Sequence, residues 1–186
     1  CFACLMYERG GTPMKKDIRT LVRRAKNGDS EAFGDLYEIY ALDMYKFALY
    51  YMRNEQDALD AVQNACVKAY SSIVSLKDPN AFKSWLFKIL SNICKSSLTS
   101  AQAKNECKTA DGDVPVVMSG QDGDFTLRTE IYDAMESLTD EERTVVILSV
   151  VHRYKSSEIA EIINCPASTV RSKLSRSLSK LRMILT

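Results

Sequence analysis

The sequence predicts an all-α protein, in which two small helical domains are joined by a flexible linker and the C-terminal domain holds a helix-turn-helix. Three observations favour this fold class. Glycine and proline are scarce, at 7 and 4 of 186 residues, which is typical of helices rather than of a turn-rich β sandwich. Apolar residues recur every three or four positions through most of the chain, which is the period of an amphipathic helix. The stretch 99–125 lacks this period and holds three of the seven glycines, as linkers do.

Composition narrows the classes to which the chain can belong. Hydrophobic residues make up 46% and charged residues 26%, which suits a chain that buries a core. Lys and Arg total 25 against 24 Asp and Glu, so a polyelectrolyte is excluded and any affinity for nucleic acid must come from local charge. Every apolar run is much shorter than a membrane-spanning helix, so no membrane insertion is expected. Six scattered cysteines form no disulfide framework and favour a reducing cytoplasm.

The pattern divides the chain into four parts. Residues 1–16 are interpreted as an N-terminal extension that need not be native, because Met14 begins a segment typical of a protein start. The first helical domain spans 17–98, the linker 99–125 and the second helical domain 126–186. A linker of this length spans about 25–30 Å on average. The two domains are therefore expected to reach separate binding places.

Four helices are predicted in the first domain. They lie at 17–26, from Asp29 or Ser30 to about Tyr51, at 57–75, and from Phe82 to near Leu98. Gly28 suits the end of the first helix, because glycine adopts the left-handed conformation that stops a helix. Phe82 and Trp85 could stack on a nucleic-acid base, but aromatic residues at helical spacing belong more often to the core. We assign both to the core.

The second domain is expected to end in a helix-turn-helix. Its predicted helices lie at 125–137, from a capping box at Thr139–Glu142, at 156–163 behind a serine cap, and at 168–182. A tight turn at 164–167 joins the last two, and Pro166 suits the first position of the final helix. The core face of that helix is predicted to be Val170, Leu174, Leu178 and Leu181.

The final helix concentrates basic charge. Residues 168–182 contain five Lys or Arg and no acidic residue, in a chain whose net charge is +1. Such a helix fits the major groove of DNA, where Arg pairs with guanine and Ser, Thr and Lys hold bases or phosphates. The alternative is an ordinary solvated helix face. The candidate DNA-binding residues here are Ser168, Thr169, Arg171, Ser172, Lys173, Ser175 and Arg176.

Motifs in both domains resemble those of one protein family. The first domain carries Gly28–Phe33 followed by Leu36 and Tyr37, then Asp57–Gln63, then Phe82–Leu86 with Asn92. The second carries Leu138–Arg143, Ser157–Ala160 and Thr169–Arg176. In this order, with a linker between the two groups, the motifs resemble the extracytoplasmic-function sigma factors of bacterial RNA polymerase, over about residues 17–98 and 127–184. No motif is decisive alone, but the ordered set is much more specific.

The resemblance implies a role for each surface. The third helix would bind core RNA polymerase through Asp57, Asp60, Gln63 and Asn64. The loop 78–81 would hold a base flipped out of the non-template strand, and the fourth helix would follow the single strand. The residues implied in this melting of the −10 promoter element are Asp78, Asn80, Lys88, Asn92 and Lys95.

The C-terminal helix-turn-helix would read the −35 element of promoter DNA. The family commonly has an anti-sigma factor as a further partner. One departure concerns the stretch after Asn92, where the family usually has an acidic residue and then a basic cluster, whereas this chain has Ser96–Ser100. We therefore expect weaker phosphate anchoring in the first domain than in the second.

No motif supports catalysis or metal binding. The sequence lacks a nucleophile elbow, a Gly-rich phosphate loop and paired carboxylates, so no catalytic residue is assigned and the chain is not expected to be an enzyme. Cys1 and Cys4 have the spacing of metal ligands, but no second pair accompanies them and His152 is the single histidine. No metal and no cofactor are therefore expected.

Two other classes remain open. A dimeric helix-turn-helix regulator would bind a palindromic operator without polymerase. A helical interaction protein would use its basic helix on an acidic protein surface and would show no dependence on DNA. Transcription from particular promoters that requires this chain and core polymerase would distinguish the sigma-factor interpretation from both.

Overall fold

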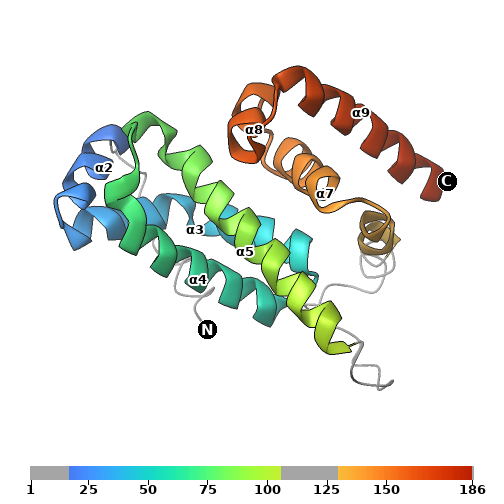
Figure 1. Cartoon of the computed structure of the whole chain (residues 1–186), viewed down its shortest axis with the longest axis horizontal. Helices are drawn as coiled ribbons and strands as arrows, with labels where there is room; N and C mark the ends of the chain where they lie inside the picture. The colour runs from blue at the N-terminus through green and yellow to red at the C-terminus, as the bar shows by residue number, and fades with distance from the viewer. Residues whose placement is uncertain (1–16, 106–129, 186) are drawn as a thin grey trace.

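The computed structural model describes residues 17–105 and 130–185, and all regular structure in these two ranges is helical (Figure 1). The first range, called the first module, holds α2 (Ile18–Lys26), α3 (Ser30–Met52), α4 (Glu55–Ser72) and α5 (Phe82–Asn105), with 3₁₀ turns at Ile73–Ser75 and Pro79–Ala81. The second range, called the second module, holds a helical segment at 130–136, α7 (Asp140–Val146), a π-helical turn (Ile147–Val151), α8 (Ser156–Ile163) and α9 (Ala167–Ile184). The predicted all-α class is confirmed. The predicted N-terminal extension and most of the predicted linker lie outside the described residues.

Side chains cap the helices of the first module. Asp17, Asp29 and Asn54 each accept a hydrogen bond from a backbone N–H in the first turn of α2, α3 and α4, which satisfies a donor that has no partner within its helix. Gly28 follows α2 with φ +90°, a backbone conformation in which a Cβ would be strained. The predicted end of the first helix is confirmed.

Two predicted helix boundaries are wrong. Arg53 adopts a left-handed conformation with φ 64°, so Arg53 and Asn54 alone join α3 to α4, and α4 begins at Glu55 rather than at Asp57. The fourth helix continues to Asn105 instead of ending near Leu98. The added residues include no Gly or Pro, and Ala, Gln and Lys have high helix propensity.

α3 lies at the centre of the first module. Its buried face carries Phe33, Leu36, Tyr40, Met44, Phe47, Ala48 and Tyr51. α4 packs on this face through small residues, among them Ala58, Ala65 and Ala69, which allow the two helices to approach closely. Phe82 is buried at the start of α5, and Trp85 is half-buried against it. Both aromatic residues belong to the core, as predicted.

The second module confirms the capping box and corrects two details of α8 and α9. The Thr139 hydroxyl accepts from the Glu142 backbone N–H while the Glu142 carboxylate accepts from the Thr139 backbone N–H. The predicted serine cap of α8 is wrong, because Lys155 precedes the helix and its backbone N–H donates to Glu158 at 2.8 Å. Pro166 is the N-cap of α9 and not its first helical residue.

One predicted core position of α9 is also wrong. Val170 and Ser177 are fully buried, whereas Leu178 is 43% exposed. At about 100° per residue, Ser177 points within about 20° of Val170, while Leu178 is turned about 80° away. The buried Ser177 hydroxyl donates to the Lys173 carbonyl of the same helix at 2.8 Å.

The two modules pack directly against each other (Figure 1). α8 lies on α5, and the π-helical turn lies on α3. Between them the His152 side chain, 2% exposed, contacts the rings of Phe47, Phe87 and Tyr154 at centroid distances of 6.3, 5.7 and 5.7 Å. These three aromatic residues and His152 are called the aromatic seam. Through it one hydrophobic core runs across both modules, which the sequence did not predict.

Candidate nucleic-acid interface

The helix-turn-helix is formed by α8, a short turn and α9. Asn164 ends α8 in the left-handed conformation, with φ 54°, and the Cys165 backbone N–H donates to the Ala160 carbonyl at 3.0 Å. Asparagine tolerates this backbone conformation better than most residues. Ile159, Ile162 and Val170 are buried beneath the turn. The turn thereby sets the direction of α9. One side of α9 packs on the module, and its opposite side faces solvent.

The candidate residues of α9 lie on this solvent side. Ser168, Arg171, Ser172, Ser175 and Arg176 are exposed, and Thr169 and Lys173 are half-exposed. The Arg176 Nε donates to the Ser172 carbonyl at 3.2 Å, and the Ser172 hydroxyl donates to the Ser168 carbonyl at 3.0 Å. Arg171 makes no ion pair within the described residues, so its guanidinium is available to a partner.

Two lysines of α9 are held by the first turn of α7. Lys173 pairs with Glu141, and Lys180 donates to both carboxylate oxygens of Glu142 at 2.9 and 3.0 Å. Hydrogen bonds from these lysines hold the pKa values of Glu141 and Glu142 below their usual range. The basic charge that α9 presents to solvent is therefore smaller than the sequence count suggests, and Arg171 and Arg176 are the fully exposed cations among its candidate residues.

The candidate residues of the first module form a second surface. Asp78 caps the 3₁₀ turn Pro79–Ala81, accepting from the backbone N–H and the side-chain amide of Asn80 at 2.9 and 3.0 Å. Both residues are exposed. This mutual contact holds the Asn80 side chain in place at the start of α5.

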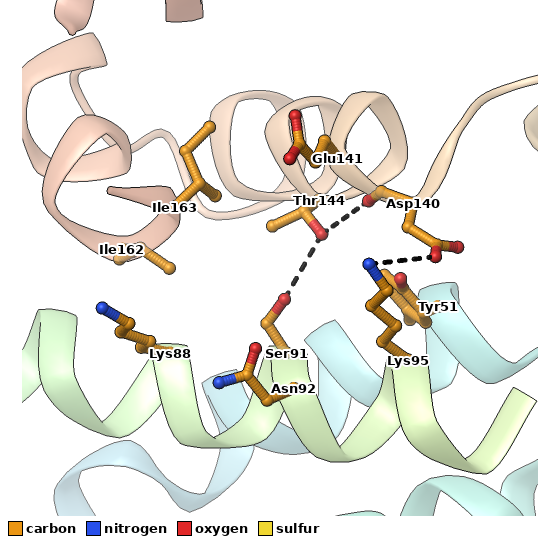
Figure 2. A pocket seen from close by; sticks show the side chains of 10 residues that line it. All are labelled: Tyr51, Lys88, Ser91, Asn92, Lys95, Asp140, Glu141, Thr144, Ile162 and Ile163. Atoms are coloured by element: carbon orange, nitrogen blue, oxygen red, sulfur yellow. Dashed lines mark hydrogen bonds and ion pairs between the residues drawn. The ribbon is translucent and has the colours of Figure 1, made fainter. Parts of the chain in front are cut away.

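Lys88, Asn92 and Lys95 share one face of α5, because they are spaced four and three residues apart. Figure 2 shows them directed towards the second module, across a cavity of about 140 Å³. The opposite wall of the cavity is formed by Asp140, Glu141 and Thr144 of α7 and by Ile162 and Ile163 of α8. The Lys95 Nζ lies 3.7 Å from an Asp140 carboxylate oxygen. The structure therefore brings the three α5 residues together and places a carboxylate beside them.

The candidate polymerase-binding residues occupy the outer face of α4. Asp57, Asp60, Gln63 and Asn64 are all exposed. The same face continues with Val67, Tyr70 and Val74, which are 69, 52 and 69% exposed. Sequence analysis missed these three side chains. Their spacing from Gln63, of four, three and four residues, was the signal that could have found them.

The chain shows no built metal site or membrane helix in the part that the structure describes. No group of three His, Cys, Asp or Glu side chains could hold a metal ion there. No helix among residues 17–105 and 130–185 is long and apolar enough to cross a membrane. Cys94 is buried, which raises the pKa of its thiol to about 12. Cys1, Cys4 and Cys107 lie outside the described residues.

Comparison with known proteins finds similarity to sigma factors of bacterial RNA polymerase. The family Sigma-70 region 2 matches residues 36–104, and the family Sigma-70, region 4 matches residues 128–181. RNA polymerase sigma factor SigV of Bacillus subtilis (strain 168) is 31% identical, over 77% of this chain and 85% of the relative. ECF RNA polymerase sigma factor SigW of the same organism is 28% identical, over 91 and 97%. Among solved structures, the sigma factor RpoE in complex with the anti-sigma factor NepR, from Bartonella quintana, has the same fold, with a TM-score of 0.69, 23% identity, and 82 and 96% of the two chains covered.

Proposed function

Because the chain belongs to the extracytoplasmic-function sigma factors of bacterial RNA polymerase, we propose that its three polar surfaces divide promoter-specific initiation between them. Sigma factors are initiation factors and not enzymes, so the chemistry of transcription belongs to the polymerase. The observation that carries the proposal is the exposed pair Arg171 and Arg176 on α9, next to a buried helix-turn-helix core. The chain would act in the cytoplasm, where the polymerase is.

The second module would read the −35 element with α9. A helix of this kind lies in the major groove, where a guanidinium can form two hydrogen bonds to one guanine. Arg171 and Arg176 are the two candidates for such contacts, and the hydroxyl groups of Ser168, Ser172 and Ser175 suit phosphates or base edges. Lys173 can reach a phosphate only after the Glu141 carboxylate gives way, since the two are paired in the structure.

The first module would open the −10 element with the loop 78–81 and α5. Flipping a base out of the stack costs a few kcal/mol, which contacts in the loop pocket can offset without ATP. Asn80, held by Asp78, offers an amide edge to the flipped base. Lys88 and Lys95 would bind phosphates of the single strand, and Asn92 lies between them on the same helix face.

The outer face of α4 would bind core polymerase. Polar side chains on this face suit a surface that is wetted when unbound, and Asp57, Asp60, Gln63 and Asn64 provide them. Exposed apolar side chains next to a polar patch are the usual anchors of an interface. Val67, Tyr70 and Val74 are therefore included in the proposed polymerase-binding surface. An anti-sigma factor is proposed as a further partner, because a sigma factor of known structure with the same fold is in complex with one.

Run-off transcription with purified core polymerase tests the proposal. On a library of promoter fragments, selective transcripts should appear only when this chain is added. Arg171→Ala or Arg176→Ala should weaken recognition of the upstream element by about 1–3 kcal/mol if the guanidinium contacts a base. Lys180→Ala is the matched control, because Glu142 already holds that amine and little change is expected.

Three results would count against parts of this proposal. Equal loss on all promoters would make the two arginines phosphate contacts rather than readers of sequence. A loss in Lys180→Ala as large as in the arginine variants would assign the effect to stability of the second module. Absence of any promoter-selective transcript, together with polymerase-free binding to a palindromic site, would favour a dimeric regulator.

A further inference from the structure

We infer that α2 anchors the phosphate backbone of promoter DNA next to the loop 78–81. This inference rests on the proposed function, because it takes that loop as the place where a base is flipped out. It adds a further DNA-binding surface to the first module, formed by Arg19, Arg23 and Lys26 of α2 and by Lys77 just before the loop. These four side chains are called the basic row.

Positive charge on α2 is dense and largely unpaired. The nine residues of this helix include four Arg or Lys and no acidic residue. One of the four, Arg24, is paired with Asp29 at 2.7 Å. Arg23 and Lys77 are exposed and make no ion pair within residues 17–105 and 130–185. A run of like charge is often only a solvated face, so the position of this charge has to decide its role.

The carboxylates at the two ends of the basic row are engaged elsewhere. Asp17 accepts hydrogen bonds from the Thr20 hydroxyl and from the backbone N–H of Arg19. Asp78 accepts from the backbone N–H and the side-chain amide of Asn80. Both carboxylates therefore stabilise their own turns and leave the cations beside them available to an anion from outside.

Three members of the basic row share one side of α2. At about 100° per residue, Arg19, Arg23 and Lys26 lie within about 60° of one another. The Lys26 Nζ donates to the Leu76 carbonyl, so this side of α2 faces the segment that leads into the loop 78–81. Lys77 is the next residue along that segment and is exposed. Cations from two distant parts of the sequence thus meet on one surface.

The basic row lies beside the proposed base pocket. α2 packs against the 3₁₀ turn Pro79–Ala81, and in Figure 1 it lies at the same end of the first module as the start of α5. From Arg19 to Lys26 the helix spans about 10 Å, which is the rise of about three nucleotides along one DNA strand. A base that enters the loop brings its flanking phosphates to this end of the module. The row has the charge and the length to bind them.

The partner is DNA because α5 alone offers few cations to the strand. Beyond Asn92 this helix has Lys95, and Ser96–Ser100 contains no cation. Contacts between Lys or Arg and phosphates supply much of the affinity of proteins for nucleic acid and fix its register, but they carry no sequence information. The basic row is therefore a positioning surface, whereas the loop selects the base.

The salt dependence of DNA binding tests the basic row in the polymerase holoenzyme. The DNA is a short fork made from a promoter that the run-off assay selects, with a non-template strand that is single-stranded across the −10 element. The row variant is Arg19→Gln with Arg23→Gln, and the charge-retaining variant is Arg19→Lys with Arg23→Lys. The matched control is Lys46→Gln with Arg153→Gln, which removes the same charge at exposed residues outside every proposed surface.

Fluorescence anisotropy gives the affinity between about 50 and 200 mM salt. Each contact to a single-strand phosphate adds about 0.7 to the slope of log affinity against log salt. Loss of two contacts should lower the slope by about 1.4, so over this range the wild-type affinity should fall about sevenfold more than that of the row variant. The charge-retaining variant and the control should keep the wild-type slope. Affinity for core polymerase should be the same for all four proteins.

Neutral phosphates locate the contact on the DNA. Methylphosphonate is placed at each of the phosphates flanking the flipped base, one at a time, which removes one negative charge. At least one of these forks should bind more weakly to the wild type. The same fork should cause no further loss in the row variant, because the contact is already absent.

The results separate failure of the basic row from failure of the proposed function. A wild-type slope in the row variant, an equal drop in the control, or additive effects of the variant and every neutral phosphate overturns the inference. Weaker binding to core polymerase would assign the row to the polymerase and also overturns it. In all these cases the loop still stands if Asn80→Ala changes base preference at the flipped position. If Asn80→Ala has no effect, or no promoter is selected, the loop assignment fails and the basic row falls with it.

Discussion

Phe87→Ala provides a quantitative test of the packing between the two modules. The Phe87 ring is fully buried and contacts Phe47 of its own module at a centroid distance of 6.0 Å, and His152 and Tyr154 of the second module at 5.7 and 5.5 Å. Truncation of a buried Phe to Ala typically costs about 3–5 kcal/mol. Because two of the three ring contacts join the first module to the second, part of this cost comes from the packing between the two modules.

A double-mutant cycle isolates that part. Urea unfolding followed by circular dichroism gives the free energy of unfolding of Phe87→Leu, Tyr154→Leu and the double variant. An edge-on aromatic pair contributes about 0.5–1.5 kcal/mol beyond its buried area, so a coupling energy of this size is expected. Tyr70→Leu is the control partner, because Tyr70 packs on Phe33 in another part of the first module. A coupling near zero for the first cycle, or equal coupling in both cycles, would refute the packing described here.

Two further predictions concern single side chains of the second module. Thr139→Ala removes the N-cap hydrogen bond of α7 and should lower the free energy of unfolding by about 1 kcal/mol, whereas Thr139→Ser should retain most of it; equal losses would show that the cap contributes nothing. Burial lowers the pKa of His152, with Lys46 and Lys83 acting in the same direction and Asp43 opposing them. The unfolded chain therefore binds the His152 proton more readily than the folded chain. The free energy of unfolding should be highest above the ordinary histidine pKa of about 6.5, and it should decline as the pH falls from there towards the lowered pKa of folded His152. Unfolding titrations between pH 7.5 and about 5.5 should show this decline in the wild type and lose it in His152→Gln, and an unchanged slope in the variant would assign the decline to other groups.

Most of the helices and much of the candidate site could be predicted from the sequence. The period of the apolar residues indicated the buried face of α3, and Asp29, Gly28 and Thr139 marked helix ends because their side chains or backbone act locally. Every candidate site residue is exposed or half-exposed. Prediction failed where local rules compete. Arg53 adopts the left-handed conformation that usually belongs to Gly or Asn, and α4 begins two residues later, at Glu55. The helix α5 continues past Leu98 to Asn105.

The pairing of charges could not be predicted. Lys173 and Lys180 look equivalent to Arg171 and Arg176 in the sequence. In the structure, however, both lysines form ion pairs with the first turn of α7, whereas the two arginines are exposed to solvent. The reason is distance along the chain. Glu141 and Glu142 precede these lysines by about 30 to 40 residues, so only the packing of α7 on α9 decides which cations meet them.

The sequence by itself determined the helices, the helix-turn-helix and the polar faces of α4, α5 and α9, because these depend on residues within one or two helical turns of each other. Only the tertiary structure decided that Ser177 rather than Leu178 is buried, that His152 is enclosed by rings from both modules, and that Lys95 of α5 lies beside the Asp140 carboxylate of α7. The spacing of apolar and polar residues along a helix shows which side chains are buried and which are exposed. It does not show what lies opposite them, since that depends on contacts between residues far apart in the chain.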